Sequence, residues 1–290
     1  MVYLEFFKLR EFPFALTCDE RFFFEYPQLA QVLKRAVYTI QQRRGMVFLT
    51  GDVGAGKTLV ARVLASRLGI ACQTLTIGHP LDSAEQALRA AGKALGINFP
   101  ADLDKLALME GLEQHLVRLN RRGRLVALVF DEAQNLGDEA LEEIRLLWNL
   151  EQEGGRLAQI VLMGQPELRQ RLKAPRWEPL MQRVVLTYHL GPLTAEETMA
   201  YILHRRRVAR GDGCLLKFTQ NAMAAIHRAS RGLPRLINVV CDNALLVGFA
   251  HQRTTINSAT VAEAAKGLPA AEAGVPRLFT DSQDLYANGS

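Results

Sequence analysis

Residues 51 to 58 read Gly-Asp-Val-Gly-Ala-Gly-Lys-Thr, which matches the phosphate-loop pattern G-x-x-x-x-G-K-[ST], and they directly follow the apolar run 46–49. Glycine has no side chain, so successive backbone N–H groups of such a loop can close around phosphate oxygens. The alternative is a glycine turn with an incidental lysine, and the strand–loop–helix context argues against it. This octapeptide therefore predicts an α/β fold that binds a phosphorylated ligand.

Each part of this loop has an expected contact with a nucleoside triphosphate. Lys57 would reach the β- and γ-phosphates, and Thr58 would hold Mg²⁺ through its hydroxyl. The helix that opens at Leu59 would direct the positive end of its dipole at the same anion. The predicted nucleotide-binding residues are Gly51, Asp52, Val53, Gly54, Ala55, Gly56, Lys57, Thr58 and Leu59.

A second motif follows the apolar run 125–130, which is typical of a central parallel strand covered on both faces. This run ends in Asp131 and Glu132, and ligands bind at such strand ends in open α/β sheets. Asp131 is expected to coordinate Mg²⁺ through water, and Glu132 to orient and deprotonate the attacking water. Alone, two acids fit a strand end or a helix cap equally well. Beside a phosphate loop they predict a hydrolytic site.

Hydrophobic periodicity predicts an alternation of strands and helices in the first two thirds of the chain. The predicted strands are 46–50, 71–77, 125–130, 157–163 and 183–189, and the helices are 28–43, 59–68, 82–95, 103–121 and 138–153. This alternation is typical of a parallel sheet with helices on both faces. Strand 71–77 leaves room for an extra strand between the two motif strands, an arrangement associated with a catalytic glutamate.

The pattern changes after His189, where helical segments continue without a convincing strand. Thr194 and Glu197 form a capping-box pattern that predicts the start of the first of these helices. The predicted domains are an aromatic-rich segment and helix at 1–45, an α/β domain at 46–191, a small all-helical domain at 192–267 and a flexible tail at 268–290.

Composition indicates a globular protein, with 290 residues, 49% hydrophobic and 22% charged. The four cysteines form no C-x-x-C pair, which favours reduced thiols and a cytoplasmic location. No apolar run reaches the ~18 residues of a membrane helix, so any membrane association is expected to be peripheral. The net charge of +5 includes arginine clusters at 121–124, 169–176 and 205–210, which would suit an anionic partner or the ends of helices.

The motifs together resemble those of the AAA+ ATPases. More specifically, the chain resembles the general secretion pathway protein A (ExeA) group and its shorter relative MshM, of mannose-sensitive haemagglutinin (MSHA) pilus biogenesis, over roughly residues 3 to 266. The segments that carry this resemblance are Tyr3-Leu-Glu-Phe-Phe7, Phe12-Pro-Phe14, Asp131-Glu-Ala-Gln134, Gly164-Gln-Pro-Glu-Leu168 and Arg231-Gly-Leu-Pro-Arg-Leu-Ile-Asn238. It implies a P-loop AAA+ domain followed by a helical lid.

The resemblance implies further site residues. Gln165 stands where such ATPases place a γ-phosphate sensor, commonly a shorter polar residue, and it also fits a turn before a proline. Arg235 matches the lid arginine that reaches the nucleotide, with Arg231 close enough to substitute. Arg183 is the candidate finger for a neighbouring subunit's ATP, Arg176 competes with it, and a surface ion pair is the alternative for both.

The resemblance also implies an activity, Mg²⁺-dependent hydrolysis of ATP, and a setting. The chain would act as an assembly or remodelling motor for a type IV (MSHA-type) pilus or a type II secretion apparatus. Its partners would be copies of itself, in a ring or filament, and inner-membrane components. Longer ExeA members continue through a membrane span into a peptidoglycan-binding domain that this sequence does not contain, so direct peptidoglycan binding is not expected.

Two other functions remain open from the sequence. ATPases of the transposition target-selector type (TniB and TnsC-like) share these motifs and assemble on duplex DNA, in which case arginines 205–207 would line a DNA groove. A nucleotide-gated scaffold is the third interpretation. An intact Glu132 argues against a scaffold, because a scaffold needs no general base.

Overall fold

The computed structural model describes residues 3–266, and the predicted tail at 268–290 lies outside them. The chain forms two compact units whose boundaries lie after Thr17 and after Gly191. The first unit contains residues 18–191, and the second combines the N-terminal segment with the residues that follow Gly191. The predicted N-terminal domain at 1–45 is therefore not a separate body, because its first part belongs to the second unit.

The 18–191 unit is built on a five-stranded parallel sheet with the strand order β2-β3-β6-β1-β7. The strands are β1 (Met46–Gly51), β2 (Cys72–Ile77), β3 (Leu125–Phe130), β6 (Ala158–Gly164) and β7 (Val184–Leu190). An extra strand does lie between the two motif strands β1 and β3, but it is β6. The strand that precedes β3 in sequence, β2, lies at the edge of the sheet.

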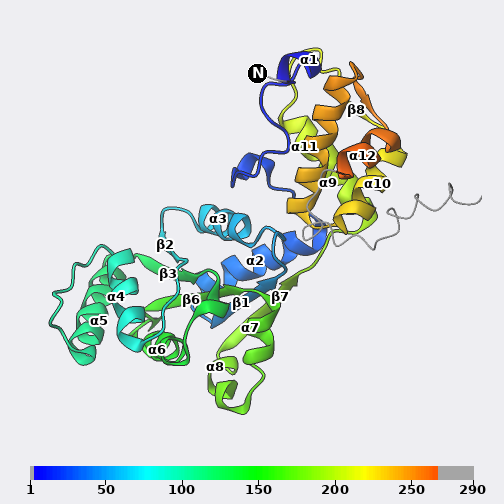
Figure 1. Cartoon of the computed structure of the whole chain (residues 1–290). Coiled ribbons are helices and arrows are strands. Elements are labelled where there is room, and N and C mark those ends of the chain that lie inside the picture. Colours follow the sequence, from blue (N-terminus) through cyan, green and yellow to red (C-terminus); the bar gives the residue numbers. More distant parts are fainter. Residues whose placement is uncertain (1–2, 267–290) are drawn as a thin grey trace, which may run out of the picture. The chain divides into compact units, whose positions relative to one another are not determined.

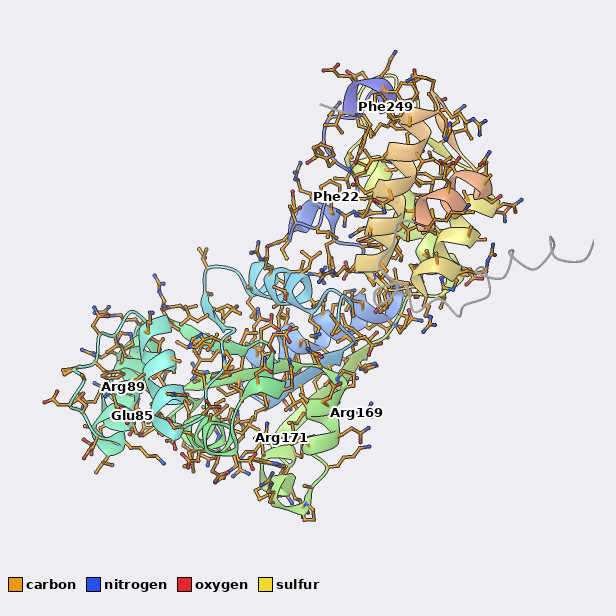
Figure 2. The ribbon with its side chains drawn as sticks, viewed as in Figure 1. Phe22, Glu85, Arg89, Arg169, Arg171 and Phe249 are labelled. Atoms are coloured by element: carbon orange, nitrogen blue, oxygen red, sulfur yellow. The ribbon has the colours of Figure 1, made fainter. Side chains whose placement is uncertain are left out.

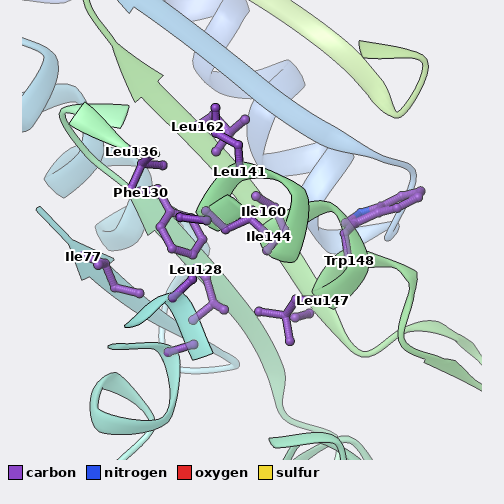
Figure 3. Packing of buried hydrophobic residues seen from close by; sticks show 14 of the residues in the cluster. Ile77, Leu128, Phe130, Leu136, Leu141, Ile144, Leu147, Trp148, Ile160 and Leu162 are labelled. Carbon is purple, nitrogen blue, oxygen red and sulfur yellow. The ribbon is translucent and has the colours of Figure 1, made fainter. Parts of the chain in front are cut away.

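Helices cover both faces of this sheet because successive strand residues point to opposite sides. Val47 and Leu49 of β1 pack with α2 (Pro27–Gln41) and α3 (Lys57–Leu68). Met46 and Phe48 belong to the cluster of the other face, which includes α4 (Ala84–Ala94), α5 (Lys105–Arg121) and α6 (Asp138–Asn149). Figure 1 shows these layers, and Figure 3 shows α6 packed on β3 and β6 in the second cluster.

The remaining elements of this unit are short. They are η1 (Glu20–Phe22), η2 (Ala133–Asn135), β4 (Glu151–Gln152), β5 (Gly155–Arg156), α7 (Pro166–Arg171), η3 (Pro175–Trp177) and α8 (Glu178–Met181). The prediction of a helix to residue 153 was wrong, because α6 ends at Asn149 and the β4–β5 hairpin follows. Gly154 and Gly155 have φ angles of 106° and 109°, which a helix does not allow.

The second unit is mainly helical. Its elements are α1 (Leu4–Phe7), α9 (Ala195–Val208), β8 (Lys217–Phe218), α10 (Gln220–Ser230), α11 (Pro234–Ala250), β9 (Thr255–Ile256) and α12 (Ser258–Ala265). The predicted capping box begins α9, where the Thr194 N–H donates to Glu197 and the Glu197 N–H donates to the Thr194 hydroxyl. One feature was not predicted from the sequence: β8 and β9 form a short parallel pair. Within residues 3–266, no helix combines the length and apolar character needed to cross a bilayer.

The N-terminal segment is fixed to this helical unit by a buried arginine. Arg205 of α9 is 3% exposed, and its guanidinium donates to the carbonyl of Pro13 at 2.5 Å and to that of Ala15 at 2.9 Å. A third bond reaches the Tyr201 hydroxyl at 3.0 Å. Because Arg205 is enclosed, arginines 205–207 cannot line a DNA groove as a set. Arg206 is half-buried, and only Arg207 is exposed.

We expect Arg205→Ala to destabilise the protein, because it leaves two backbone carbonyls without their donor. Each such loss costs about 1–3 kcal/mol, so the total should be about 2–6 kcal/mol. The matched control is Arg207→Ala, a change of an exposed arginine on the same helix that should stay within about 0.5 kcal/mol. Chemical denaturation followed by circular dichroism measures both. Equal stability of the two variants would contradict the anchoring role.

Candidate functional site

The phosphate loop connects the end of β1 to the start of α3. Gly54 and Gly56 have φ angles of 83° and 95°, a left-handed conformation that glycine adopts without strain. Gly51 has a different requirement, because a Cβ there would lie 2.9 Å from the carbonyl oxygen of Leu190. No side chain caps the first turn of α3. The backbone N–H groups of this turn are therefore available to an anion.

Lys57 begins α3 and is 5% exposed. Its ammonium donates to two carbonyls of its own loop, those of Gly51 at 2.9 Å and Asp52 at 3.2 Å. Among residues 3–266, it takes part in no ion pair with a carboxylate. A buried cation with only neutral acceptors is suited to a negatively charged ligand, and polyphosphate provides that charge.

Two side chains with oxygen atoms that can bind a metal lie together beside the loop. The Thr58 hydroxyl donates to Asp131 Oδ2 at 2.9 Å, and Asp131 is 7% exposed at the end of β3. The other carboxylate oxygen, Oδ1, accepts the backbone N–H of Glu132 at 2.9 Å. A hydroxyl and a carboxylate are the hard ligands that Mg²⁺ prefers, and a few protein ligands plus water and phosphate are its usual set. The pair fits the predicted Mg²⁺ site; no larger His/Cys/Asp/Glu cluster occurs in residues 3–266.

Glu132 follows Asp131 with a left-handed backbone of φ 52°. Its Oε2 accepts from two carboxamides, Gln134 Nε2 at 2.5 Å and Gln165 Nε2 at 3.2 Å. Burial alone would raise the pKa of Glu132, but these two hydrogen bonds and the positive charge of Lys57 together hold that pKa below its usual range. Glu132 is therefore a carboxylate at neutral pH, as a general base must be.

The sheet brings these groups together because its strands are parallel. Phe130 of β3 pairs with Leu162 of β6, and Gly164 of β6 pairs with Thr50 of β1. The phosphate loop, the acidic pair and Gln165 thus follow the adjacent strands β1, β3 and β6 at the same, carboxyl-terminal ends of these strands. The residue whose role the sequence analysis missed is Gln134. Its only sequence signal was its place in the segment 131–134.

Of the arginines predicted from the sequence, Arg183 lies far from the phosphate loop of its own chain. Arg183 precedes β7 and so lies at the amino-terminal end of the strands, opposite the phosphate loop. At that end Val184 pairs with Met46, whereas at the loop end Leu190 pairs with Gly51. Five residues of strand separate these positions, about 16 Å at 3.3 Å per residue. Arg183 therefore lies far from its own phosphate loop. Its guanidinium donates to the side chain of Asn149 at 3.1 Å and to the carbonyl of Pro179.

The other predicted arginines lie elsewhere. Arg176 is exposed and pairs with Asp138 at 2.5 Å, and Arg171 of α7 (Figure 2) pairs with the same carboxylate. The basic cluster at 169–176 is thus partly neutralised. Arg235 is exposed in the first turn of α11, and Arg231 ends α10 with a left-handed φ of 52°. Both belong to the helical unit, so their approach to a nucleotide stays a prediction.

Comparisons with known proteins bear on the fold and the relatives of this chain. The family model described as an AAA domain matches residues 40–172, which include the phosphate loop, the acidic pair and Gln165. General secretion pathway protein A of Aeromonas hydrophila is 36% identical over 250 residues, which cover 86% of this chain and 45% of that protein. The chain therefore spans about half the length of this relative.

Solved structures share the fold at lower identity. Cdc6p of Pyrobaculum aerophilum matches with a TM-score of 0.67 and 19% identity, covering 87% of this chain and 74% of that one. The Thermotoga maritima RuvB branch migration motor matches with a TM-score of 0.62 and 18% identity, covering 92% and 76%. These likenesses confirm the predicted fold class, a parallel-sheet P-loop unit with further helices. The chain thus carries an AAA domain on a P-loop fold and is related to general secretion pathway protein A.

Proposed function

We propose that this protein is an Mg²⁺-dependent ATPase whose hydrolytic site is completed by a neighbouring copy. The observation that carries the proposal is the combination of a buried, unpaired Lys57 with an ionised Glu132 held near the same strand ends. The first group suits a polyphosphate, and the second suits the activation of water. A pure nucleotide-gated scaffold would need only the first.

The residues divide the chemistry among them. The loop N–H groups and Lys57 would bind the phosphates, and Thr58 and Asp131 would hold Mg²⁺, which would supply neutralisation of the charge that develops on the phosphate oxygens. Glu132 orients a water molecule and takes its proton. Gln165, which already contacts Glu132, is the candidate sensor of the terminal phosphate.

Arg183 supports completion by a second subunit. It lies at the end of the strands opposite its own loop, so it does not serve the nucleotide of its own subunit. Burial and the like charges of Arg145 and Arg156 lower the pKa of Arg183, whereas Glu142 raises it. Arg145 and Arg156 are themselves paired with Glu142 and Glu151, so Arg183 is the guanidinium of this group that would meet the polyphosphate of an adjoining subunit in a ring or filament. We assign the finger to Arg183 over Arg176, because Arg176 is paired with the Asp138 carboxylate, whereas Arg183 donates to the neutral acceptors Asn149 and Pro179.

The biological setting follows from the relative. General secretion pathway protein A is 36% identical to this chain, and its name places it in secretion. We propose that this chain is a cytoplasmic assembly motor for a type II secretion apparatus or a type IV pilus, attached to inner-membrane components through partners. DNA-dependent assembly is the competing function. The burial of Arg205 removes part of the basic surface that it requires.

The first test is ATP hydrolysis per subunit as a function of protein concentration, with and without duplex DNA. We expect a rate that rises with concentration, because each site needs an arginine from its neighbour, and that changes less than about twofold with DNA. A rate independent of concentration would contradict completion in trans. Strong stimulation by DNA would favour the transposition-type function.

Two substitutions separate binding from turnover. Lys57→Ala should weaken nucleotide binding by about 10–150-fold, the equivalent of one lost hydrogen bond to a charged group. Glu132→Gln should leave the Kd within about threefold and lower kcat by about 10²–10⁴-fold, because the general base is removed. The matched control is Glu139→Gln, an exposed glutamate of α6. Normal turnover in Glu132→Gln would show that the base is another group.

Mixing experiments test the assignment of Arg183. Arg183→Ala alone should lower kcat by about 10³-fold or more, the usual contribution of an arginine finger. In an equal mixture with Lys57→Ala, about a quarter of the sites should combine an intact loop with an intact finger and regain activity. A purely structural role of Arg183 predicts no such gain. Rescue of Arg176→Ala instead would move the finger to Arg176.

A further inference from the structure

Gln134 lies in η2, two residues beyond Glu132, and both ends of its carboxamide are hydrogen-bonded. The Nε2 group donates to Glu132 Oε2 at 2.5 Å, and Oε1 accepts the backbone N–H of Gln165 at 3.0 Å. A backbone N–H only donates, so it fixes which end of the amide faces it. The NH₂ group must then face Glu132. Gln134 thus connects Glu132, the second residue after β3, to Gln165, the first residue after β6.

The Gln134 amide lies close to the backbone of β6. Gly164, the last residue of β6, packs against it: a Cβ at this glycine would lie 3.0 Å from Gln134 Oε1 and 2.8 Å from a methyl group of Leu168. Leu168 is fully buried and has no room to move aside. The absence of a side chain at Gly164 is therefore what lets the Gln134 amide lie against the strand end.

The two carboxamides use the same oxygen of Glu132. Gln134 and Gln165 both donate to Oε2, at 2.5 Å and 3.2 Å. Among residues 3–266, no group donates to Oε1. The carboxylate is therefore oriented, with one oxygen held by the protein and the other left for a water molecule. The shorter bond comes from the amide that is itself fixed at its far end, whereas the Gln165 side chain makes no second bond to any residue of the described part of the chain.

We propose that Gln134 is a positioning residue of the hydrolytic site. It holds Glu132 by Oε2, so that Oε1 faces the attacking water, and it ties the general base to the strand end that carries the candidate sensor. The Gln165 side chain is then the exchangeable contact: it can turn to a terminal phosphate while Gln134 keeps the base in place. This inference rests on the proposed ATPase function.

The test is steady-state kinetics of Gln134→Met, which keeps the length of the side chain and removes its donor and acceptor. We expect kcat to fall about 10–100-fold, while KM and the Kd of a fluorescent ADP analogue stay within about threefold, because the phosphate loop is untouched. The matched control is Gln170→Ala, an exposed glutamine of α7, which should keep kcat. Equal losses in kcat and in nucleotide affinity would indicate a structural role and overturn the proposal.

A second variant guards against misfolding of the first. Gln134→Glu keeps an acceptor for the Gln165 N–H but places a carboxylate oxygen against Glu132, so it should also lower kcat while ADP binding is kept. A double-mutant cycle with Gln165→Ala then tests the shared oxygen. The loss in the double variant should be smaller than the product of the single losses, because both amides act on one carboxylate. Multiplicative losses would overturn the link between the two residues.

The outcomes distinguish this inference from the proposed function. Hydrolysis by the wild-type protein that is lost in Glu132→Gln but unchanged in Gln134→Met would leave the ATPase function standing and overturn the role of Gln134. Absence of hydrolysis by the wild-type protein at every concentration would overturn both.

Discussion

The nucleotide site depends on one buried charge, the ammonium of Lys57. An ammonium removed from water costs several kcal/mol unless other oxygen atoms replace the water. Here the carbonyls of Gly51 and Asp52 replace the water, and both belong to the phosphate loop that directly precedes Lys57. The path of the loop and the place of the charge therefore stabilise each other. Neutral carbonyls do not neutralise the positive charge of Lys57, so the site favours an anion, and the same charge lowers the pKa of Glu132.

The sequence predicted the fold class and the core of the site because their signals are local. A glycine-rich octapeptide and an apolar run that ends in two acids each specify a short piece of chain, and a parallel sheet gathers strand ends without further information. Strand order was less accessible because pairing is non-local. Even so, the edge position of β2 had a signal: Gln73, Thr74 and Thr76 interrupt its apolar residues, whereas β6 carries only Gln159.

The roles of the charged and polar side chains were harder to predict. A sequence shows which residues are charged, but it does not show whether they are buried or which distant groups they contact. Arg205 reads as one of three adjacent arginines, yet it is buried against carbonyls 192 and 190 residues away. Gln134 was hidden in another way. Its position follows from a glycine on a different strand and from the backbone of Gln165, and neither contact leaves a pattern near residue 134.

The N-terminal segment belongs to the helical unit although the α/β unit follows it in sequence. Because residues 3–17 lie in the helical unit, the chain crosses between the units twice, after Thr17 and after Gly191. The bonds of Arg205 to the Pro13 and Ala15 carbonyls hold the segment that leads to the first crossing. Since a buried guanidinium that loses its acceptors is costly, these bonds explain why an arginine inside a basic run is buried rather than exposed.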